Sequence, residues 1–169
     1  MDAAFENYLA LSDLLLSDGE IMLGVDLDDS RWQRNFIRAV VALIEGYGHC
    51  FRDMAVIGLD CDGPTLSADE EKVLRSESSL GVCDRIKFTL RAAYAMFSIS
   101  PAPDFGTDEW CKAKEALEKR HSLMHPKTPS DLEITPIAWE RMRAGLTWLV
   151  ERHFDLIRLL HERHSQKGS

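Results

Sequence analysis

The chain has 169 residues, 45% of them hydrophobic, and this length and composition predict a single globular domain over residues 1–169 with one sizeable core. No apolar run approaches the ~20 residues needed to cross a bilayer, and the acidic N-terminus does not resemble a secretory signal. We therefore expect a cytoplasmic protein without a membrane partner. The four cysteines are widely spaced and form no Cys-x-x-Cys pair, which argues against a zinc ribbon or a thioredoxin-type motif.

The formal net charge of −8 is distributed unevenly along the chain. Residues 1–30 contain eight acidic side chains and no lysine or arginine, whereas the other 139 residues contain 20 basic and 20 acidic side chains. The larger part of the chain could therefore carry a local basic patch, so the net charge argues only weakly against nucleic acid. The acidic segment 1–30 is itself a candidate contact for a basic partner.

Residues 2–17 predict a short first helix. Their spacing places four side chains on one helix face, namely Phe5, Leu9, Ser12 and Leu16. The segment 26–30, Asp-Leu-Asp-Asp-Ser, then has the carboxylate spacing of a calcium loop. Arg31 and Ile37 stand at the positions where such a loop needs glycine and glutamate, so we reject a calcium site.

The longest helical pattern runs from residue 30 to about residue 59. Its apolar period predicts an amphipathic helix of about 45 Å, with local weak points at Gly46 and Gly48. The side chains predicted to face inward are Trp32, Phe36, Val40, Leu43, Ile44, Tyr47, Phe51 and Met54. A loop at Gly63 and Pro64 ends this helix, and residues 67–70, Ser-Ala-Asp-Glu, form a capping box that starts the next one.

Two more helices follow in the middle of the chain. Residues 84–99 repeat apolar side chains with a helical period, and the segment 100–106, Ser-Pro-Ala-Pro-Asp-Phe-Gly, ends that helix. Thr107 is a suitable N-cap for another helix, because Asp108 and Glu109 place negative charge in its first turn.

A long final helix is predicted to start at Thr135-Pro136. The side chains predicted to face inward are Trp139, Met142, Leu146, Leu149, Val150, Phe154, Ile157 and Leu160. No strand pattern competes with these helices. We therefore predict an all-α fold, an antiparallel bundle of about four to six helices in which residues 31–59 and 136–163 are the longest members.

The helix after Thr107 ends in an unusual group of polar side chains, Arg120, His121 and His125. On a helical wheel they border the stripe predicted to be buried, which consists of Trp110, Ala113, Leu117 and Met124 within about 60 degrees of one another. We therefore expect the polar group to contact an interface rather than open water. Pro126 biases His125 away from the α region, so His125 is a turn residue that could swing back towards Arg120.

Two plainer explanations of this group stay open. Arginine and histidine in a last helical turn interact favourably with the partly negative helix end, by about 0.3–1 kcal/mol. His121 and His125 also have the i, i+4 spacing of two zinc ligands, but the residues between them lack the glutamate of the His-Glu-x-x-His motif. We expect no metal and no cofactor.

The run Arg120-His121-Ser-Leu-Met-His125, followed by Pro126-Lys127, resembles the R-x4-6-H signature of the HEPN superfamily. Three further segments are similar to those of family members: the capped helix start at 64–70, the Arg-Ile-Lys-Phe-Thr-Leu helix at 85–90, and the segment 125–135 before the last helix. The resemblance covers about residues 30–165. His121 departs from the family, in which asparagine is commonest at that position.

The resemblance implies an all-α homodimer in which the motifs of two protomers face each other and cleave RNA without a metal. It implies that Arg120, His121 and His125 are the catalytic residues. Several members of the family belong to toxin–antitoxin or phage-defence systems, so a cognate antitoxin or a nucleotidyltransferase is an implied partner. Other members are non-catalytic modules that bind nucleotides, RNA or proteins, and that alternative stays open.

The chemistry of the three side chains also fits RNA cleavage. Without a metal, the 2′-hydroxyl is the nucleophile, and the reaction needs a base near neutral pH and a cation for the phosphorane. His125 is the candidate base, and the planar donor fork of Arg120 matches phosphate oxygens. His121 is expected to orient one of them or to carry a second proton. A two-fold axis beside the motif would double these groups in one cleft.

Overall fold

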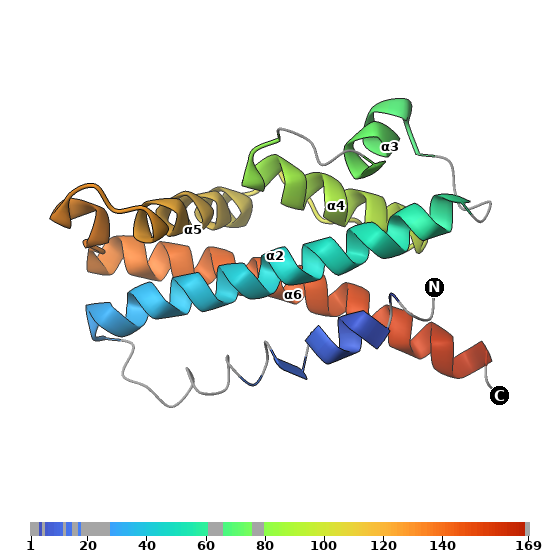
Figure 1. Cartoon of the computed structure of the whole chain (residues 1–169), viewed down its shortest axis with the longest axis horizontal. Coiled ribbons are helices and arrows are strands. Elements are labelled where there is room, and N and C mark those ends of the chain that lie inside the picture. The colour runs from blue at the N-terminus through green and yellow to red at the C-terminus, as the bar shows by residue number, and fades with distance from the viewer. Residues whose placement is uncertain are drawn as a thin grey trace.

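The structure is a computed structural model that describes residues 4, 6–11, 13–14, 17, 28–60, 66–75 and 80–167. All regular secondary structure in these residues is helical, which confirms the predicted all-α bundle. The helices are α2 (Ser30–Asp60), α3 (Ala68–Arg75), α4 (Val82–Met96), α5 (Asp108–Met124), the short 3₁₀ helix η1 (Pro129–Leu132) and α6 (Pro136–Lys167) (Figure 1). In this part of the chain, no helix combines the length and apolar character that a membrane span requires.

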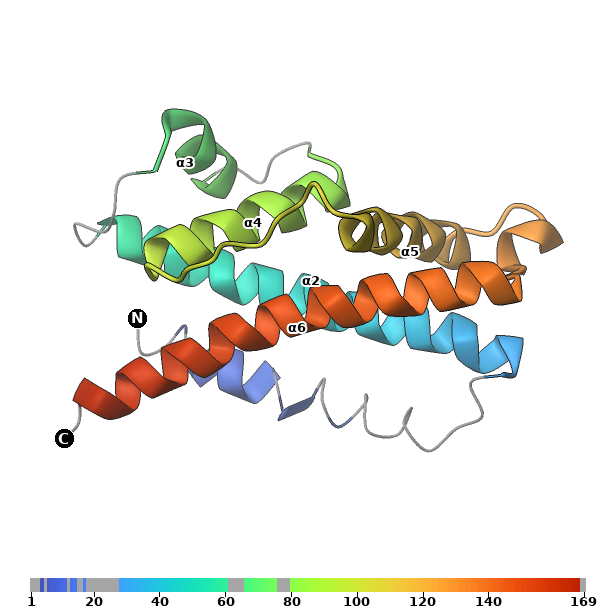
Figure 2. The same cartoon turned by 180° about the vertical axis from the view of Figure 1, so that it is seen from behind.

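The two longest helices, α2 and α6, lie side by side and run in the same direction (Figures 1 and 2). Near their starts the ring of Phe36 packs edge-on against Trp139, and further along both helices Tyr47 stacks on His153. Helix α5 runs antiparallel to α6 and joins it through η1, so the start of α2, the end of α5 and the start of α6 meet at one end of the bundle. The predicted polar group lies at this end.

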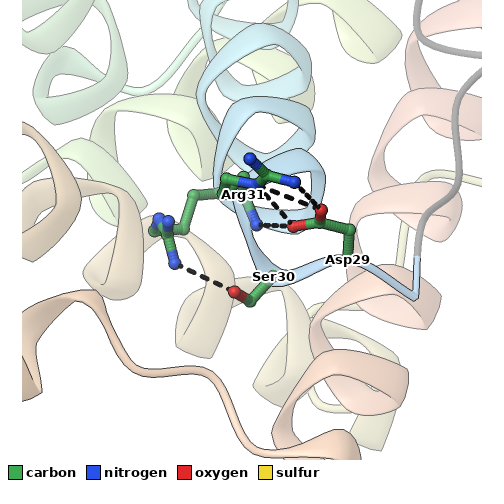
Figure 3. Close-up of polar contacts among 4 residues, drawn as sticks. Asp29, Ser30 and Arg31 are labelled. Atoms are coloured by element: carbon green, nitrogen blue, oxygen red, sulfur yellow. Dashed lines mark hydrogen bonds and ion pairs between the residues drawn. The ribbon is translucent and has the colours of Figure 1, made fainter.

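A local charged contact precedes the first turn of α2 (Figure 3). The Asp29 carboxylate accepts hydrogen bonds from the backbone N–H of Arg31, at 2.8 Å, and from its guanidinium. The Arg31 side chain lowers the pKa of Asp29 to about 2. Asp29, from the segment with calcium-loop spacing, is therefore engaged by an arginine; Asp26 lies outside the described residues.

Helix α2 continues through Gly46 and Gly48 without a break. Its buried side chains follow the predicted period and include Ile37, Val41, Leu43, Ile44, Tyr47, Cys50, Phe51, Met54 and Ala55. The prediction that Trp32 faces inward is wrong, because Trp32 lies in the first turn, at the end of the bundle, and is exposed. Val40 is only half-buried.

Two of the predicted helix starts are confirmed by hydrogen bonds to their capping side chains. The backbone N–H of Glu70 donates to Ser67 Oγ at 3.3 Å, while the Glu70 carboxylate accepts from the Ser67 N–H at 3.0 Å, which is a reciprocal capping box. The N–H of Trp110 donates to Thr107 Oγ1 at 3.4 Å at the start of α5. The loop at residues 61–65, with Gly63 and Pro64, lies outside the described residues.

Helix α6 buries a regular stripe, consisting of Trp139, Met142, Leu146, Leu149, His153 and Leu156. The prediction that Phe154 faces inward is wrong, since its ring is exposed and His153, one residue earlier, takes that place. His153 follows Leu149 by four positions and precedes Leu156 by three, so it is in register with the stripe although it is polar. The side chain of Leu160 lies outside the described part of the structure.

The N-terminal residues that are described are helical, as predicted for residues 2–17. Tyr8 is buried against the rings of Tyr47 and Phe51, at centroid distances of 5.6 and 5.9 Å. Leu9, on the helix face that the sequence pattern picked out, is exposed, because it lies about 100 degrees around the helix from the buried Tyr8. Phe5, Ser12 and Leu16 lie outside the described residues.

Candidate functional site

The polar group lies at the C-terminal end of α5. The helix stops at Met124, and His125 is the C-cap, with φ −131° and ψ 56°. The His125 N–H donates to the carbonyl of His121 at 3.1 Å, which satisfies one of the last carbonyls of the helix. His125 is therefore a turn residue before Pro126, as predicted from the sequence.

The two imidazoles of the group lie beside each other. The ring centroids of His121 and His125 are 5.3 Å apart and their planes are inclined by 56°. Both side chains are exposed. Within one protomer the two imidazoles therefore face solvent. That they contact an interface between two protomers stays a prediction.

Arg120 is paired with a carboxylate from another helix. Its Nη2 donates to Glu45 Oε2 of α2 at 3.0 Å, and only 29% of its side chain is exposed. The second Glu45 oxygen, Oε1, lies 3.7 Å from Arg85 Nη2 at the start of α4. The side-chain hydrogen bond of Arg120 is therefore made with a carboxylate from another helix and not with His125.

Glu45 is the residue of the site that sequence reasoning missed. It is the only charged side chain between Arg38 and Arg52, in a segment that is otherwise apolar or small apart from His49. A lone charge on a buried helix needs a partner, because an unpaired buried charge is costly. That signal could have drawn attention to Glu45, although it does not identify Arg120 as the partner.

The predicted buried stripe of α5 needs a correction at its end. Met124 is 46% exposed, whereas Ala116 and Leu123 are buried. A helical wheel assumes one neighbour along the whole helix, but α5 packs against both α2 and α6, so its inward face turns along its length. At the last turn Arg38 of α2 donates to the Leu123 carbonyl at 2.8 Å, which secures the end of α5.

A cleft of about 470 Å³ opens beside the group, between α2, the start of α4 and the second half of α5. Arg120, His121, Glu45 and Arg85 line it together with apolar side chains. A second cleft of about 480 Å³ lies between α5 and α6 and is mainly acidic. Only the first cleft includes residues of the predicted site.

The three described cysteines do not gather with the histidine pair into a metal site. Cys50 is buried, Cys83 is half-buried and Cys111 is exposed, all as free thiols; burial raises the pKa of the first two. Across the described ranges, no three His, Cys, Asp or Glu side chains are grouped closely enough to hold a metal ion. Cys61 lies outside those ranges.

Comparisons of the chain with protein-family models, curated proteins and solved structures found no match. The resemblance to the HEPN superfamily therefore depends on the residues of this sequence alone.

Proposed function

We propose that the protein is a metal-independent endoribonuclease of the HEPN type that acts on RNA as a homodimer. The observation that supports this most directly is the pair of exposed imidazoles, His121 and His125, whose centroids are 5.3 Å apart at the end of a helix that also carries Arg120. Two imidazoles and one guanidinium can supply the base, the acid and the cation that metal-free cleavage of RNA uses.

In the proposed reaction His125 removes the proton from a ribose 2′-hydroxyl, and the resulting oxygen attacks the adjacent phosphorus. The bond from phosphorus to the 5′ oxygen breaks, so the products are a 2′,3′-cyclic phosphate and a 5′-hydroxyl. His121 donates the proton that the leaving 5′ oxygen takes up. Arg120 stabilises the charge on the phosphorane, which a guanidinium does well because it stays charged and donates in pairs.

Glu45 supports this role by positioning Arg120. An arginine has five N–H donors, and the bond to Glu45 uses Nη2. The remaining donors are left for a phosphate, and the rotation of the side chain is restricted before the substrate arrives. Such preorganisation makes electrostatic stabilisation of a transition state more effective.

Apolar exposure at the same end of the bundle supports the homodimer. Met124, next to His125, is 46% exposed, and Ile137, in the first turn of α6, is 77% exposed. A second copy would cover these side chains and bring two motifs together. A toxin or defence role, with an antitoxin or nucleotidyltransferase as partner, follows from the family resemblance only.

A non-catalytic binding module is the second candidate. The observation that favours it is His121, which stands where asparagine is commonest in the family. In that case the same groups would hold RNA or a nucleotide phosphate without turnover.

Cleavage assays in EDTA test the proposal. The purified protein should cleave single-stranded RNA and leave DNA intact, because DNA lacks the 2′-hydroxyl. His125→Ala should reduce the rate by roughly 10²–10⁴-fold, the usual contribution of acid–base catalysis. The matched control is His49→Ala, which removes an exposed histidine from α2 and should leave the rate unchanged. Equal cleavage by wild type and His125→Ala would identify a contaminating nuclease, and RNA binding without cleavage would favour the binding module.

Mixing two inactive variants tests whether the site is shared between protomers. If Arg120 of one protomer acts with His125 of the other, a mixture of Arg120→Ala and His125→Ala chains forms heterodimers with one intact site. Random exchange of subunits makes half of the dimers mixed, and each mixed dimer has one working site of two. The mixture should therefore recover about a quarter of the wild-type rate. Light scattering that detects only monomers at micromolar concentration would contradict the homodimer.

A further inference from the structure

The cleft beside Arg120 has the size and walls of a small-ligand site. Its volume of about 470 Å³ lies within the range of about 300–1,000 Å³ that is common for such sites. Val41, Val82 and Leu117 form its apolar wall, and Arg120 and His121 line its edge. The cleft is therefore continuous with the proposed catalytic group, but the reaction described above does not use its interior.

Arg85 supplies the cleft with a cation that has not been assigned a role. Its Nη2 is 3.7 Å from Glu45 Oε1, which is too long for a hydrogen bond, and half of its side chain is exposed. The guanidinium therefore keeps its donors for a ligand, whereas Arg120 is hydrogen-bonded to the other oxygen of Glu45. Two arginines from different helices thus line one cavity.

The start of α4 adds N–H donors for an anion in the same place, although its first turn also carries the acidic Asp84. Gly81 is the N-cap of this 15-residue helix and has no side chain to accept from the first N–H groups. Gly81, Val82 and Cys83 all line the cleft, so the positive end of the helix lies beside Arg85.

Two carboxylates in the lining, Glu45 and Glu118, narrow the choice of ligand. They would repel a bare anion, but they accept hydrogen bonds from ribose hydroxyls and from the amino groups of bases. The apolar wall suits the face of a base. We infer that the cleft is a subsite for one nucleotide, whose phosphate is bound by Arg85 and the start of α4; that this nucleotide belongs to an RNA strand rests on the proposed function.

Cys83 makes the inference testable, because its thiol lines the cleft. Alkylation of individual cysteines by iodoacetamide is followed by mass spectrometry in the His125→Ala protein, which leaves the RNA uncleaved. The reaction is run at about pH 8.5, because burial raises the pKa of the Cys83 thiol. A single-stranded oligoribonucleotide at ten times its Kd should slow alkylation of Cys83 by about tenfold. The exposed Cys111 is the internal control and should react at an unchanged rate.

Arg85→Ala tests the phosphate contact, with Arg91→Ala on the same helix as its control. Arg91→Ala removes the same charge from α4, but Arg91 does not line the cleft. Fluorescence anisotropy in the His125→Ala background should give a Kd that rises roughly tenfold for Arg85→Ala. The slope of log Kd against log salt should fall by about 0.7, the value for one lost phosphate contact on a single strand. Arg91→Ala should leave both quantities unchanged.

Adenosine monophosphate and inorganic phosphate, each used in place of the oligoribonucleotide, show which part of the ligand protects Cys83 from alkylation. Protection of Cys83 by the oligoribonucleotide, alone or together with adenosine monophosphate, supports the subsite. Adenosine monophosphate that protects without any binding of RNA supports a nucleotide pocket and refutes the proposed action on RNA. RNA that binds without protecting Cys83, equal effects of Arg85→Ala and Arg91→Ala, or equal protection by inorganic phosphate would each overturn the inference while leaving the endoribonuclease proposal standing.

Discussion

The buried histidine of α6 predicts a specific dependence of stability on pH. His153 is fully buried, with its ring against those of Tyr47 and Phe51 at centroid distances of 6.2 and 6.0 Å. Its Nδ1 lies 2.7 Å from the Leu149 carbonyl, which only accepts, so Nδ1 carries the hydrogen and Nε2 is unprotonated in the neutral ring. Within the described chain, Nε2 has no hydrogen-bond partner.

Burial lowers the pKa of His153 from 6.5 to about 4. Between these values the unfolded chain binds a proton at this residue and the folded chain does not. The free energy of unfolding therefore falls as the pH is lowered from about 6.5 towards about 4, and His153 contributes no pH dependence above that window. The full difference corresponds to about 3 kcal/mol, of which about 2 kcal/mol is lost at about pH 5.

Urea unfolding followed by far-UV circular dichroism measures this effect in wild type and His153→Leu. Leucine retains an apolar volume at the site but cannot titrate, so the stability lost between about pH 7.5 and pH 5 should be smaller by about 2 kcal/mol in the variant. Carboxylates titrate in both proteins and cancel in this comparison. The control is His49→Gln, which replaces an exposed histidine of α2 and should not reproduce the effect of His153→Leu.

An equal loss of stability in wild type and His153→Leu would show that His153 does not cause this pH dependence. A lower stability of the variant at neutral pH would not refute it, because packing changes contribute at every pH. The measurement is repeated at two protein concentrations, so that dissociation of an oligomer is separated from unfolding.

Three further predictions concern the helices that support the site. Gly145→Ala should destabilise the fold by about 3 kcal/mol or more in urea unfolding, because the new Cβ would lie 2.2 Å from the backbone nitrogen of Ala113 and the two helices would have to separate. Gly48→Ala, whose Cβ meets nothing within 4 Å, should instead stabilise α2 by about 0.5–1 kcal/mol, and a loss of stability there would contradict the reasoning. Thr107→Ala removes the cap on the Trp110 N–H and should lower the unfolding free energy by about 1 kcal/mol; no change in the urea midpoint would show that the cap contributes little.

The helix starts could be predicted because their partners lie within one turn of the chain. Ser67 and Glu70 are three residues apart, as are Thr107 and Trp110, and in both pairs the side-chain oxygen and the backbone N–H meet whatever surrounds the helix. The neighbouring rings of His121 and His125 follow in the same way from their spacing of four residues.

The buried faces of the helices could be predicted only in part. The apolar period identified most of the core of α2 and α6. It missed His153, because a pattern built on apolar residues leaves out a polar residue that lies in register with them. It also placed Met124 inside, whereas α5 changes its neighbours along its length and leaves Met124 exposed. Which residue is covered at a given turn depends on the helix that crosses there, and the wheel of one helix does not contain that information.

The composition of the motif and its place at a helix end could be predicted from the sequence alone, since both follow from residue types and spacings of a few positions. The partner of Arg120 could not be predicted in this way, because Glu45 lies 75 positions away and is brought to it by the packing of α5 on α2. The cleft could likewise not be predicted from the sequence, because its walls come from three helices. Contacts between distant segments depend on how whole helices pack, and a local pattern cannot specify that packing.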